Sequence, residues 1–333
     1  MGAALPRVAL HRLPAGGPRR VGGLHGPAEV RQGMEARMTA ALSLLVAGLA
    51  VPGAPAGKQA ALWDKLRSRI ETVDRGLDGV LGLSVKDLKG GMTLEIRPQE
   101  PFPQASSIKL AVLYELFRQA EEGRVDLREL TRPPLPRVRG GGVLQELGDR
   151  LSLTWRDLAV LMMGWSDNAA TNVLIDRVGM EAVNRRLDSL GLRATRLRRK
   201  MMDLEAARRG DENVSTPAEM RQLAEAMYAG AGLSKERVKD LLAVMAVPKD
   251  SPFRVPLPED LVVADKPGSL EAVRCVTAIV DLPGRPYAVS IMTTYLRHDA
   301  DGEAAIKQIS SALYETFDRL ARSSDLGRVI SEK

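Results

Sequence analysis

Segments with the apolar pattern of β-strands lie near both ends of this 333-residue chain, and segments with helical spacing fill the middle. The expected strands are 79–85, 92–96, 261–265, 273–281 and 287–294, and the turn 88–91 makes a hairpin of the first two. Strands from one sheet must lie side by side, so the two chain ends have to meet. We therefore predict an α/β sheet formed from both ends, with a helical insertion at about 124–255.

Residues 1–56 have a different character from the rest. Residues 1–33 are rich in Gly, Pro and Arg without periodicity, which indicates a disordered or upstream extension. In 34–56, Arg37 precedes the apolar run 40–51, and Ala54 and Ala56 follow at the small-x-small spacing of a signal peptide. We expect cleavage near Ala56 and export to the periplasm or outside the cell; the alternative is an uncleaved apolar tail. The run is shorter than the roughly 20 residues of a membrane span.

The counts of cysteine and histidine exclude several kinds of site. A single cysteine, Cys275, cannot form an intrachain disulfide or a multi-cysteine zinc site, so we expect no metal and no cofactor. We interpret it as a buried strand thiol. Two of the three histidines lie in the leader, so a Ser-His-Asp triad would need His298, at the start of an expected helix. The base beside a catalytic serine is therefore expected to be a lysine or a carboxylate.

The net charge of +6 does not indicate a nucleic-acid partner. Much of the excess lies in residues 1–37, which hold six arginines against two glutamates. The basic run 193–200 is typical of a solvated face, and aromatic residues make up only 4% of the chain, which leaves few platforms for base stacking.

A serine and a lysine three residues apart, Ser106 and Lys109, lie where an apolar helix is expected to begin. This spacing places both side chains on one face of a helix. A serine beside an amine that accepts its proton is an activated nucleophile, and the first turn of a helix favours a developing negative charge. The motif alone is weak, because about one match is expected by chance in a chain of this composition.

Two further motifs follow in a fixed order. The first is the triplet Ser166-Asp167-Asn168, on an expected loop between helices. The second is the run Lys266-Pro267-Gly268-Ser269, after an expected strand. With Ser106 and Lys109 they match the trio S-x-x-K, S-D-N and K-T-G. From about residue 60 to 323 the chain resembles the serine β-lactamase and DD-peptidase superfamily, nearest its class A β-lactamase branch. The resemblance implies an α/β (α+β) fold, with an antiparallel sheet, an all-helical domain, and the active site between them.

The resemblance also implies roles for the motif residues in catalysis. Ser106 would attack the β-lactam carbonyl and form an acyl-enzyme, and Lys109 would act on the serine proton. Ser166 would relay a proton to the leaving nitrogen. Lys266 would supply positive charge near Ser166 and the substrate carboxylate.

Other residues are expected to bind the substrate. Asn168 would bind its amide, and Gly268, in the run that begins at Lys266, would also contact the substrate. The backbone N–H groups of Ser106 and Ser269 would form the oxyanion hole. Arg274 is a candidate second anchor for the substrate carboxylate, with a plain exposed strand arginine as the alternative.

The chain departs from the family pattern at two positions. Pro267 stands where a threonine or serine is usual, which removes a hydroxyl that helps to hold the substrate carboxylate. Met201 stands where class A enzymes carry the glutamate that activates the deacylating water. Asp203 or Glu205 could take over this role, but each is equally typical of a solvated loop carboxylate. Without a base, general acid-base help of roughly 10²- to 10⁴-fold could be lost from deacylation.

Three functions follow from these residues. The leading one is an exported, monomeric serine β-lactamase that opens β-lactams without metal or cofactor and takes part in antibiotic catabolism and resistance. The second is a DD-peptidase, esterase or amidase of the same fold, acting on cell-wall peptides or similar substrates, which β-lactams acylate and which releases them slowly. The third is a non-catalytic module that binds cell wall or β-lactam.

Overall fold

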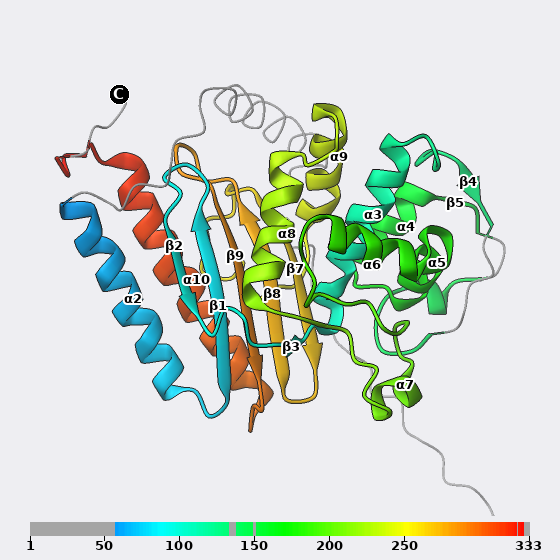
Figure 1. Cartoon of the computed structure of the whole chain (residues 1–333), viewed down its shortest axis with the longest axis horizontal. Coiled ribbons are helices and arrows are strands. Elements are labelled where there is room, and N and C mark those ends of the chain that lie inside the picture. The colour runs from blue at the N-terminus through cyan, green and yellow to red at the C-terminus, as the bar shows by residue number, and fades with distance from the viewer. Residues whose placement is uncertain (1–56, 133–137, 149–150, 325, 330–333) are drawn as a thin grey trace, which may run out of the picture.

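The computed structural model describes residues 57–132, 138–148, 151–324 and 326–329. The expected extension and signal peptide at 1–56 lie outside the described residues. Figure 1 shows the described chain as a pair of helices, a sheet and a larger group of helices, lying side by side. No described helix combines the length and the hydropathy that crossing a membrane requires.

The central sheet has five strands, and every neighbouring pair is antiparallel. Its order is β2-β1-β9-β8-β7. The strands are β1 (Val80–Asp87), β2 (Thr93–Ile96), β7 (Val263–Leu270), β8 (Val273–Val280) and β9 (Tyr287–Thr294). Because β1 pairs along its whole length with β9, the two ends of the chain meet in one sheet, which confirms the prediction.

The edge strand β7 is longer than the sequence pattern predicts. The expected strand ends at residue 265, whereas β7 continues to Leu270 and carries the motif Lys266-Pro267-Gly268-Ser269 within it. A proline fits here because an edge strand has one side on which no partner strand needs its N–H group. The motif is therefore held by the ladder with β8 rather than lying in a loop after the strand.

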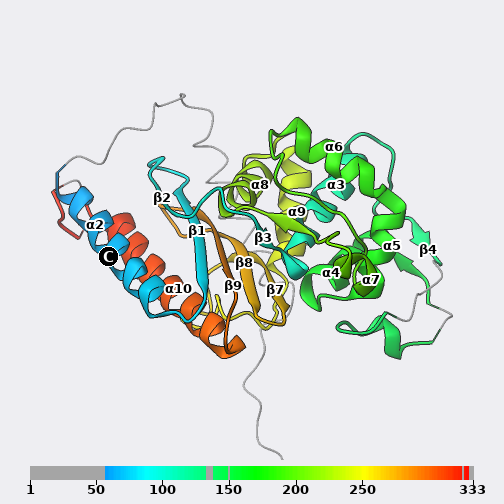
Figure 2. The same ribbon diagram turned by 60° about the horizontal axis from the view of Figure 1, so that its bottom comes forward.

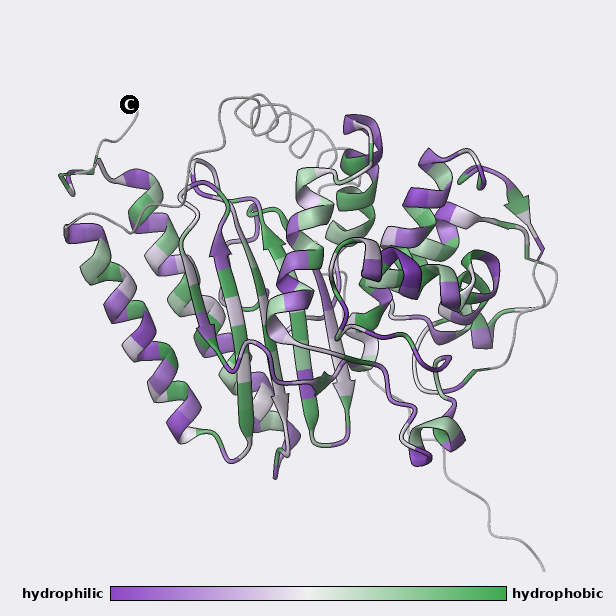
Figure 3. Ribbon diagram, in the orientation of Figure 1, coloured by the Kyte–Doolittle hydropathy of each residue, from purple (hydrophilic) through white to green (hydrophobic). Residues whose placement is uncertain are grey.

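The two faces of the sheet pack against different helices. Helices α2 (Lys58–Gly76) and α10 (Asp299–Arg322) cover one face, and α8 (Pro217–Ala229) lies on the other (Figure 2). Cys275 and Val276 are neighbours on β8, yet each belongs to a different apolar cluster. The amino-acid sequence of a strand that is buried on both faces is a nearly continuous run of apolar residues. Figure 3 shows this as hydrophobic colour along the strands, in contrast to the banded helix α2.

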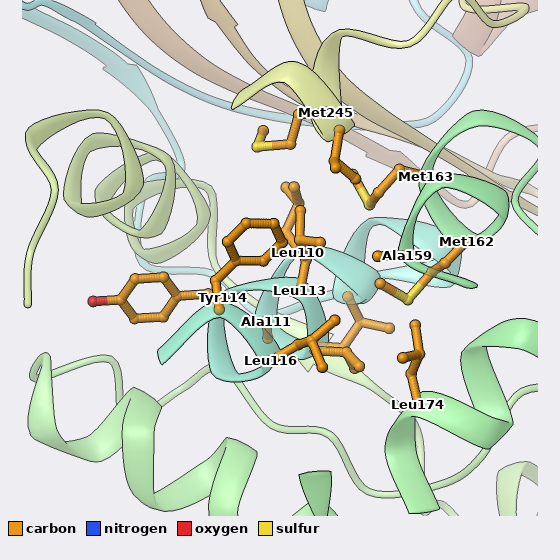
Figure 4. Close-up of a cluster of buried hydrophobic side chains, with 14 of the residues drawn as sticks. Leu110, Ala111, Leu113, Tyr114, Leu116, Ala159, Met162, Met163, Leu174 and Met245 are labelled. Atoms are coloured by element: carbon orange, nitrogen blue, oxygen red, sulfur yellow. The ribbon is translucent and has the colours of Figure 1, made fainter. Parts of the chain in front are cut away.

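Helix α3 (Lys109–Glu121) is the centre of the helical group. Its apolar side chains face all directions, as is typical of a fully buried helix, and Figure 4 shows them against residues from the helices around it. The other long helices are α4 (Trp155–Gly164), α5 (Asn168–Val178), α6 (Met180–Ser189) and α9 (Lys235–Ala246).

Short elements complete the described chain. They are β3 (Phe102–Pro103), β4 (Leu130–Thr131), β5 (Leu153–Thr154), β6 (Val214–Ser215), α7 (Leu204–Arg208), and the 3₁₀ turns η1 (Ala105–Ile108) and η2 (Leu144–Glu146).

Side-chain caps begin both α4 and α5. At the start of α4, the Thr154 hydroxyl accepts from the Asp157 N–H group at 3.0 Å and the Asp157 carboxylate accepts from Thr154 N–H at 2.9 Å, which makes a capping box. The Asp167 carboxylate caps α5 by accepting from Ala170 N–H at 2.8 Å. Ser166 lies in the short connection between the end of α4 and the start of α5, where the N–H groups of Trp165 and Asp167 both donate to the Leu161 carbonyl at 3.1 Å.

Candidate active site

Ser106 lies in the 3₁₀ turn η1, which runs directly into α3. The residue before it, Ala105, has a φ of 44°, a left-handed conformation that is uncommon for a residue with a Cβ atom. Ser106 is partly exposed, while Lys109 at the start of α3 is fully buried. The turn thus presents the serine hydroxyl to solvent and keeps the amine inside.

Ser166 connects Ser106 to Lys109. The Ser166 and Ser106 hydroxyl oxygens are 2.9 Å apart, and Lys109 Nζ lies 3.0 Å from Ser166 Oγ. Lys109 Nζ also donates to the Ser166 carbonyl at 2.7 Å and to Asn168 Oδ1 at 2.9 Å. Sequence spacing placed Lys109 beside Ser106; the structure adds that the hydrogen-bonded path between them passes through Ser166. Ser166 reaches this position with a φ of 52°.

The surroundings of Lys109 favour the uncharged amine. Burial lowers the pKa of Lys109 well below its ordinary value, and the charge of Lys266 lowers it further, against an opposing effect of Asp167. A neutral amine has two hydrogens and one lone pair. The Ser166 carbonyl and Asn168 Oδ1 can only accept, so the lone pair faces the Ser166 hydroxyl, whose hydrogen is free to rotate. Lys109 can therefore take a proton from Ser106 by way of Ser166.

Lys266 supplies a second buried amine on β7, where it is 1% exposed. Burial lowers the pKa of Lys266 to about 8, against the opposing attraction of Asp265. Asp265 is itself buried and is held by Lys249, Arg254 and Ser251, the last at 2.6 Å. Lys266 therefore remains largely cationic at neutral pH.

A cavity of about 330 Å³ opens at these residues. Ser106 and Ser166 line one side of it, and Lys266, Pro267 and Ser269 on β7 line another. A larger, mixed-charge hollow of about 820 Å³ lies between the end of α3 and the start of α9, and its lining holds none of the motif residues. The cavity at Ser106 is the candidate active site because the motif residues converge there.

Six of the described lining residues have no site role in the sequence analysis: Gly140, Asp250, Pro252, Val255, Glu303 and Lys307. Gly140 opens a run of three glycines whose φ values are all positive, so the run of glycines was a readable signal of unusual backbone. Asp250, Glu303 and Lys307 come from other parts of the fold, and no local pattern marked them.

Asp167 also anchors the loop that carries the three glycines at 140–142. Its carboxylate accepts from the N–H groups of Val143 at 2.7 Å and Leu144 at 2.8 Å, in addition to capping α5. The glycine loop thus shares one anchor with the Ser166 loop. A Cβ atom at Gly142 would lie 2.3 Å from that carboxylate, which explains why a glycine is needed there.

Met201 is buried where the family pattern has a glutamate. Asn172 on α5 holds its backbone on both sides, accepting from Met201 N–H at 2.8 Å and donating to the Met201 carbonyl at 3.1 Å. The two carboxylates that could take over are elsewhere. Asp203 caps α7 by accepting from Ala206 N–H, and Glu205 is exposed in the first turn of that helix. Neither is among the described residues that line the cavity.

Arg274 on β8 is paired rather than free. Its guanidinium lies 2.9 Å from Asp299 and 3.1 Å from Glu303, both on α10, and its side chain is 13% exposed. The alternative of a plain exposed strand arginine therefore does not describe it. Glu303 also lines the cavity, so Arg274 is linked to the site through this carboxylate.

A histidine base and a metal site are the two alternatives to the lysine-dependent chemistry described above. His298 precedes α10, is exposed, and is not among the described residues that line the cavity at Ser106. Within the described ranges, no group of three or more His, Cys, Asp or Glu side chains is arranged to hold a metal ion.

The chain matches a model of the beta-lactamase enzyme family over residues 65–317. It is 25% identical over 259 residues to an imipenem-hydrolyzing beta-lactamase of Enterobacter cloacae, a match that covers 75% of this chain and 88% of that protein. The crystal structure of a beta-lactamase from Sphaerobacter thermophilus superposes with a TM-score of 0.69 at 29% identity, covering 77% and 98% of the two chains. A PBP-A variant, solved as an acyl-enzyme complex with penicillin G, gives 0.69 at 28% identity, covering 77% and 97%. The chain therefore belongs to the beta-lactamase enzyme family.

Proposed function

We propose that this protein opens β-lactam rings through an acyl-enzyme on Ser106. The observation that carries the proposal is the path from the Ser106 hydroxyl through the Ser166 hydroxyl to Lys109, a buried amine whose pKa is lowered by that burial. A serine becomes a nucleophile when a base can accept its proton in place. The family to which the chain belongs supports the same chemistry.

Acylation follows from this geometry. Ser106 Oγ attacks the lactam carbonyl while its proton passes to Ser166 and the Ser166 proton passes to Lys109 Nζ. The C–N bond of the ring then breaks, and the proton returns from Lys109 through Ser166 to the leaving nitrogen. The product is an ester on Ser106 and an amine on the opened ring. The backbone N–H groups of Ser106 and Ser269 bind the carbonyl oxygen, at roughly 3 kcal/mol per donor in other enzymes.

The positive charge of Lys266 attracts the substrate carboxylate, and Asn168 binds the side-chain amide. Pro267 brings no hydroxyl to this part of the cavity, and Arg274 shares its charge with Asp299 and Glu303. Lys266 is therefore the main anchor for the substrate carboxylate. A site with a threonine or serine at position 267 and an unpaired arginine would bind the carboxylate with three groups instead of one. The proposed partners are small molecules, with the chain acting as a monomer.

The second candidate function is a penicillin-binding peptidase or esterase with slow release of the acyl group. The specific observation that favours it is Met201, an apolar side chain held by Asn172 where a water-activating carboxylate is expected. The acylating machinery is unaffected by this residue. Toward β-lactams, the two candidates therefore differ in the rate at which the acyl group is released.

A chromogenic cephalosporin separates the candidates. The purified full chain is mixed with it, and colour release is followed over time against enzyme concentration. Sustained turnover supports a β-lactamase, and a stoichiometric burst that stops supports the penicillin-binding alternative. The absence of any burst contradicts acylation and leaves the non-catalytic binding module. Ser106→Ala should abolish both turnover and burst.

We also propose that the protein is exported, with cleavage after Ala56. The support is the sequence pattern of residues 34–56, which lie outside the described residues. N-terminal sequencing of the protein recovered outside the cytoplasm is expected to begin at Gly57. A start before Ala50 would contradict cleavage at this site.

A further inference from the structure

The turn that carries Ser106 is in direct contact with strand β7. A Cβ atom built on Gly268 would lie 2.9 Å from the backbone nitrogen of Ser106, 2.9 Å from the Gln104 carbonyl oxygen and 2.8 Å from the Cys275 sulfur. Any side chain at Gly268 would therefore push the turn away from the strand. The Ser106 N–H group is one of the two proposed oxyanion donors, so its distance from β7 is chemically important.

Two side chains hold this contact together. The Ser107 hydroxyl donates to the Lys266 carbonyl at 2.9 Å, and so ties the residue after the nucleophile to the strand that carries Lys266 and Ser269. Cys275 lies opposite Gly268 in the ladder between β7 and β8. Its thiol donates to the Gln104 carbonyl at 3.1 Å, and its sulfur lies 3.4 Å from Ser107 Oγ. Both residues are buried.

The turn needs such support because its backbone is strained. Ala105, between Gln104 and Ser106, has a φ of 44°, and a left-handed residue with a side chain costs of order 1–3 kcal/mol unless its surroundings hold it. The Cys275 thiol donates its hydrogen bond to the carbonyl of Gln104, the residue directly before Ala105. The bond to Gln104 and the bond from Ser107 thus restrain the turn on both sides of Ser106.

We propose that Cys275 and Ser107 are positioning residues that hold the Ser106 N–H group at the distance from Ser269 required to bind the carbonyl oxygen of the substrate. This inference rests on the proposed acylation of Ser106. Neither side chain touches the substrate; both act through the backbone of the turn. Catalysis is sensitive to this arrangement because oxyanion donors must lie within about 2.7–3.1 Å of the developing charge.

The thiol is available for this task over the working pH range. Burial raises the pKa of Cys275 to about 11, against opposing contributions from Ser107, Lys266 and Arg274. The sulfur therefore keeps its hydrogen and remains a donor to Gln104 at neutral pH. Cys275, to which the sequence analysis assigns no role, is thus linked to Ser106 through its hydrogen bond to the Gln104 carbonyl.

The vibrational frequency of the acyl carbonyl tests the proposal, because stronger oxyanion hydrogen bonds lower it. The full chain and its variants are acylated with penicillin G labelled with ¹³C at the lactam carbonyl, and the ester band is isolated by isotope difference. Cys275→Ala and Ser107→Ala should move the band to higher wavenumber. They should also slow acylation by about tenfold, less than the 10²–10³-fold cost of removing an oxyanion donor outright, with substrate affinity unchanged. Cys275→Ser, which keeps a donor, should lie nearer the wild type.

Val276→Ala is the matched control, because Val276 is the next residue on β8 and packs in the cluster on the opposite face. It should lower thermal stability and leave the band in place. An unshifted band in both Cys275→Ala and Ser107→Ala, or an equal shift in Val276→Ala, would overturn the proposal. If Cys275→Ala does not fold, Ser107→Ala and Cys275→Ser decide it. A wild-type chain that forms no ester contradicts the proposed function instead.

Discussion

Lys109 Nζ lies 3.0 Å from the hydroxyl of Ser166, and that hydroxyl lies 2.9 Å from the hydroxyl of Ser106. The base and the nucleophile are thus joined by a third side chain, from a different segment of the chain. The order of these contacts decides what each substitution should do.

Removal of the Ser166 hydroxyl should interrupt the proton path while leaving Ser106 and Lys109 in place. We expect Ser166→Ala to slow acylation by roughly 10²- to 10⁴-fold, the usual contribution of general acid-base catalysis. Lys109→Met should cost a similar factor. The double variant should be little worse than either single one, because the two residues act as a unit. Stopped-flow acylation rates measure this, and fully additive losses would show that the residues act independently.

The pH dependence of acylation should have two limbs. On the acid side the acylation rate should fall as Lys109 gains a proton and can no longer act as the base. Because burial lowers the pKa of Lys109 well below its ordinary value, this fall should occur at a lower pH than for an exposed lysine. On the alkaline side the rate should fall near pH 8, as Lys266 loses the charge that attracts the substrate carboxylate.

The variant Lys266→Arg tests the alkaline limb, since arginine keeps its charge throughout this range. Its residual activity should not decline near pH 8. A limb that stays at the same pH in this variant would assign it to another group.

Deacylation should respond to the residue at position 201. We expect Met201→Glu to speed release of the acyl group, because it restores a carboxylate at the position where the family pattern has the water-activating glutamate, on backbone that Asn172 holds. Asp203→Ala and Glu205→Ala should leave turnover unchanged, since neither carboxylate is among the described residues lining the cavity. The lifetime of the acyl-enzyme, followed by intact mass, measures all three. Accumulation of the acyl-enzyme in either alanine variant would identify a deacylation base.

The sheet and the motif positions could be predicted from the sequence because both depend on local pattern. Apolar runs marked β1, β8 and β9, and the three motifs marked Ser106, Ser166 and Lys266, which meet at the cavity. The contacts between segments could not be read in this way. The bridge from Ser106 to Lys109 depends on a φ of 52° at Ser166, which spacing does not reveal.

The partners of Arg274 illustrate the same limit. Asp299 and Glu303 are 25 and 29 residues away in sequence, and only the packing of α10 beside β8 brings them to the guanidinium. Strand β7 also continues beyond the apolar residues that predicted it, because its hydrogen-bonded ladder with β8 includes the polar motif residues.

A buried acid on α3 should contribute to stability rather than to catalysis. The Glu115 side chain is 2% exposed and accepts from Arg186 Nε at 2.8 Å and from Gln119 Nε2 at 2.9 Å. Glu115→Ala removes these two hydrogen bonds, while Arg186 keeps its pair with Glu122 and Gln119 keeps its bond to the Val178 carbonyl, so we expect a loss of about 1–3 kcal/mol in the free energy of unfolding. Urea titration at neutral pH measures it. Loss of the exposed pair between Arg185 and Glu181 should have no measurable effect.

In the proposed reaction, Ser106 forms a covalent ester with β-lactams. Mass spectrometry of the full chain, quenched in acid after brief exposure to penicillin G, tests it most directly. We expect a gain of one penicillin per chain, located on the peptide that contains Ser106 and absent from Ser106→Ala. An unmodified chain, or an adduct that persists in Ser106→Ala, would contradict it.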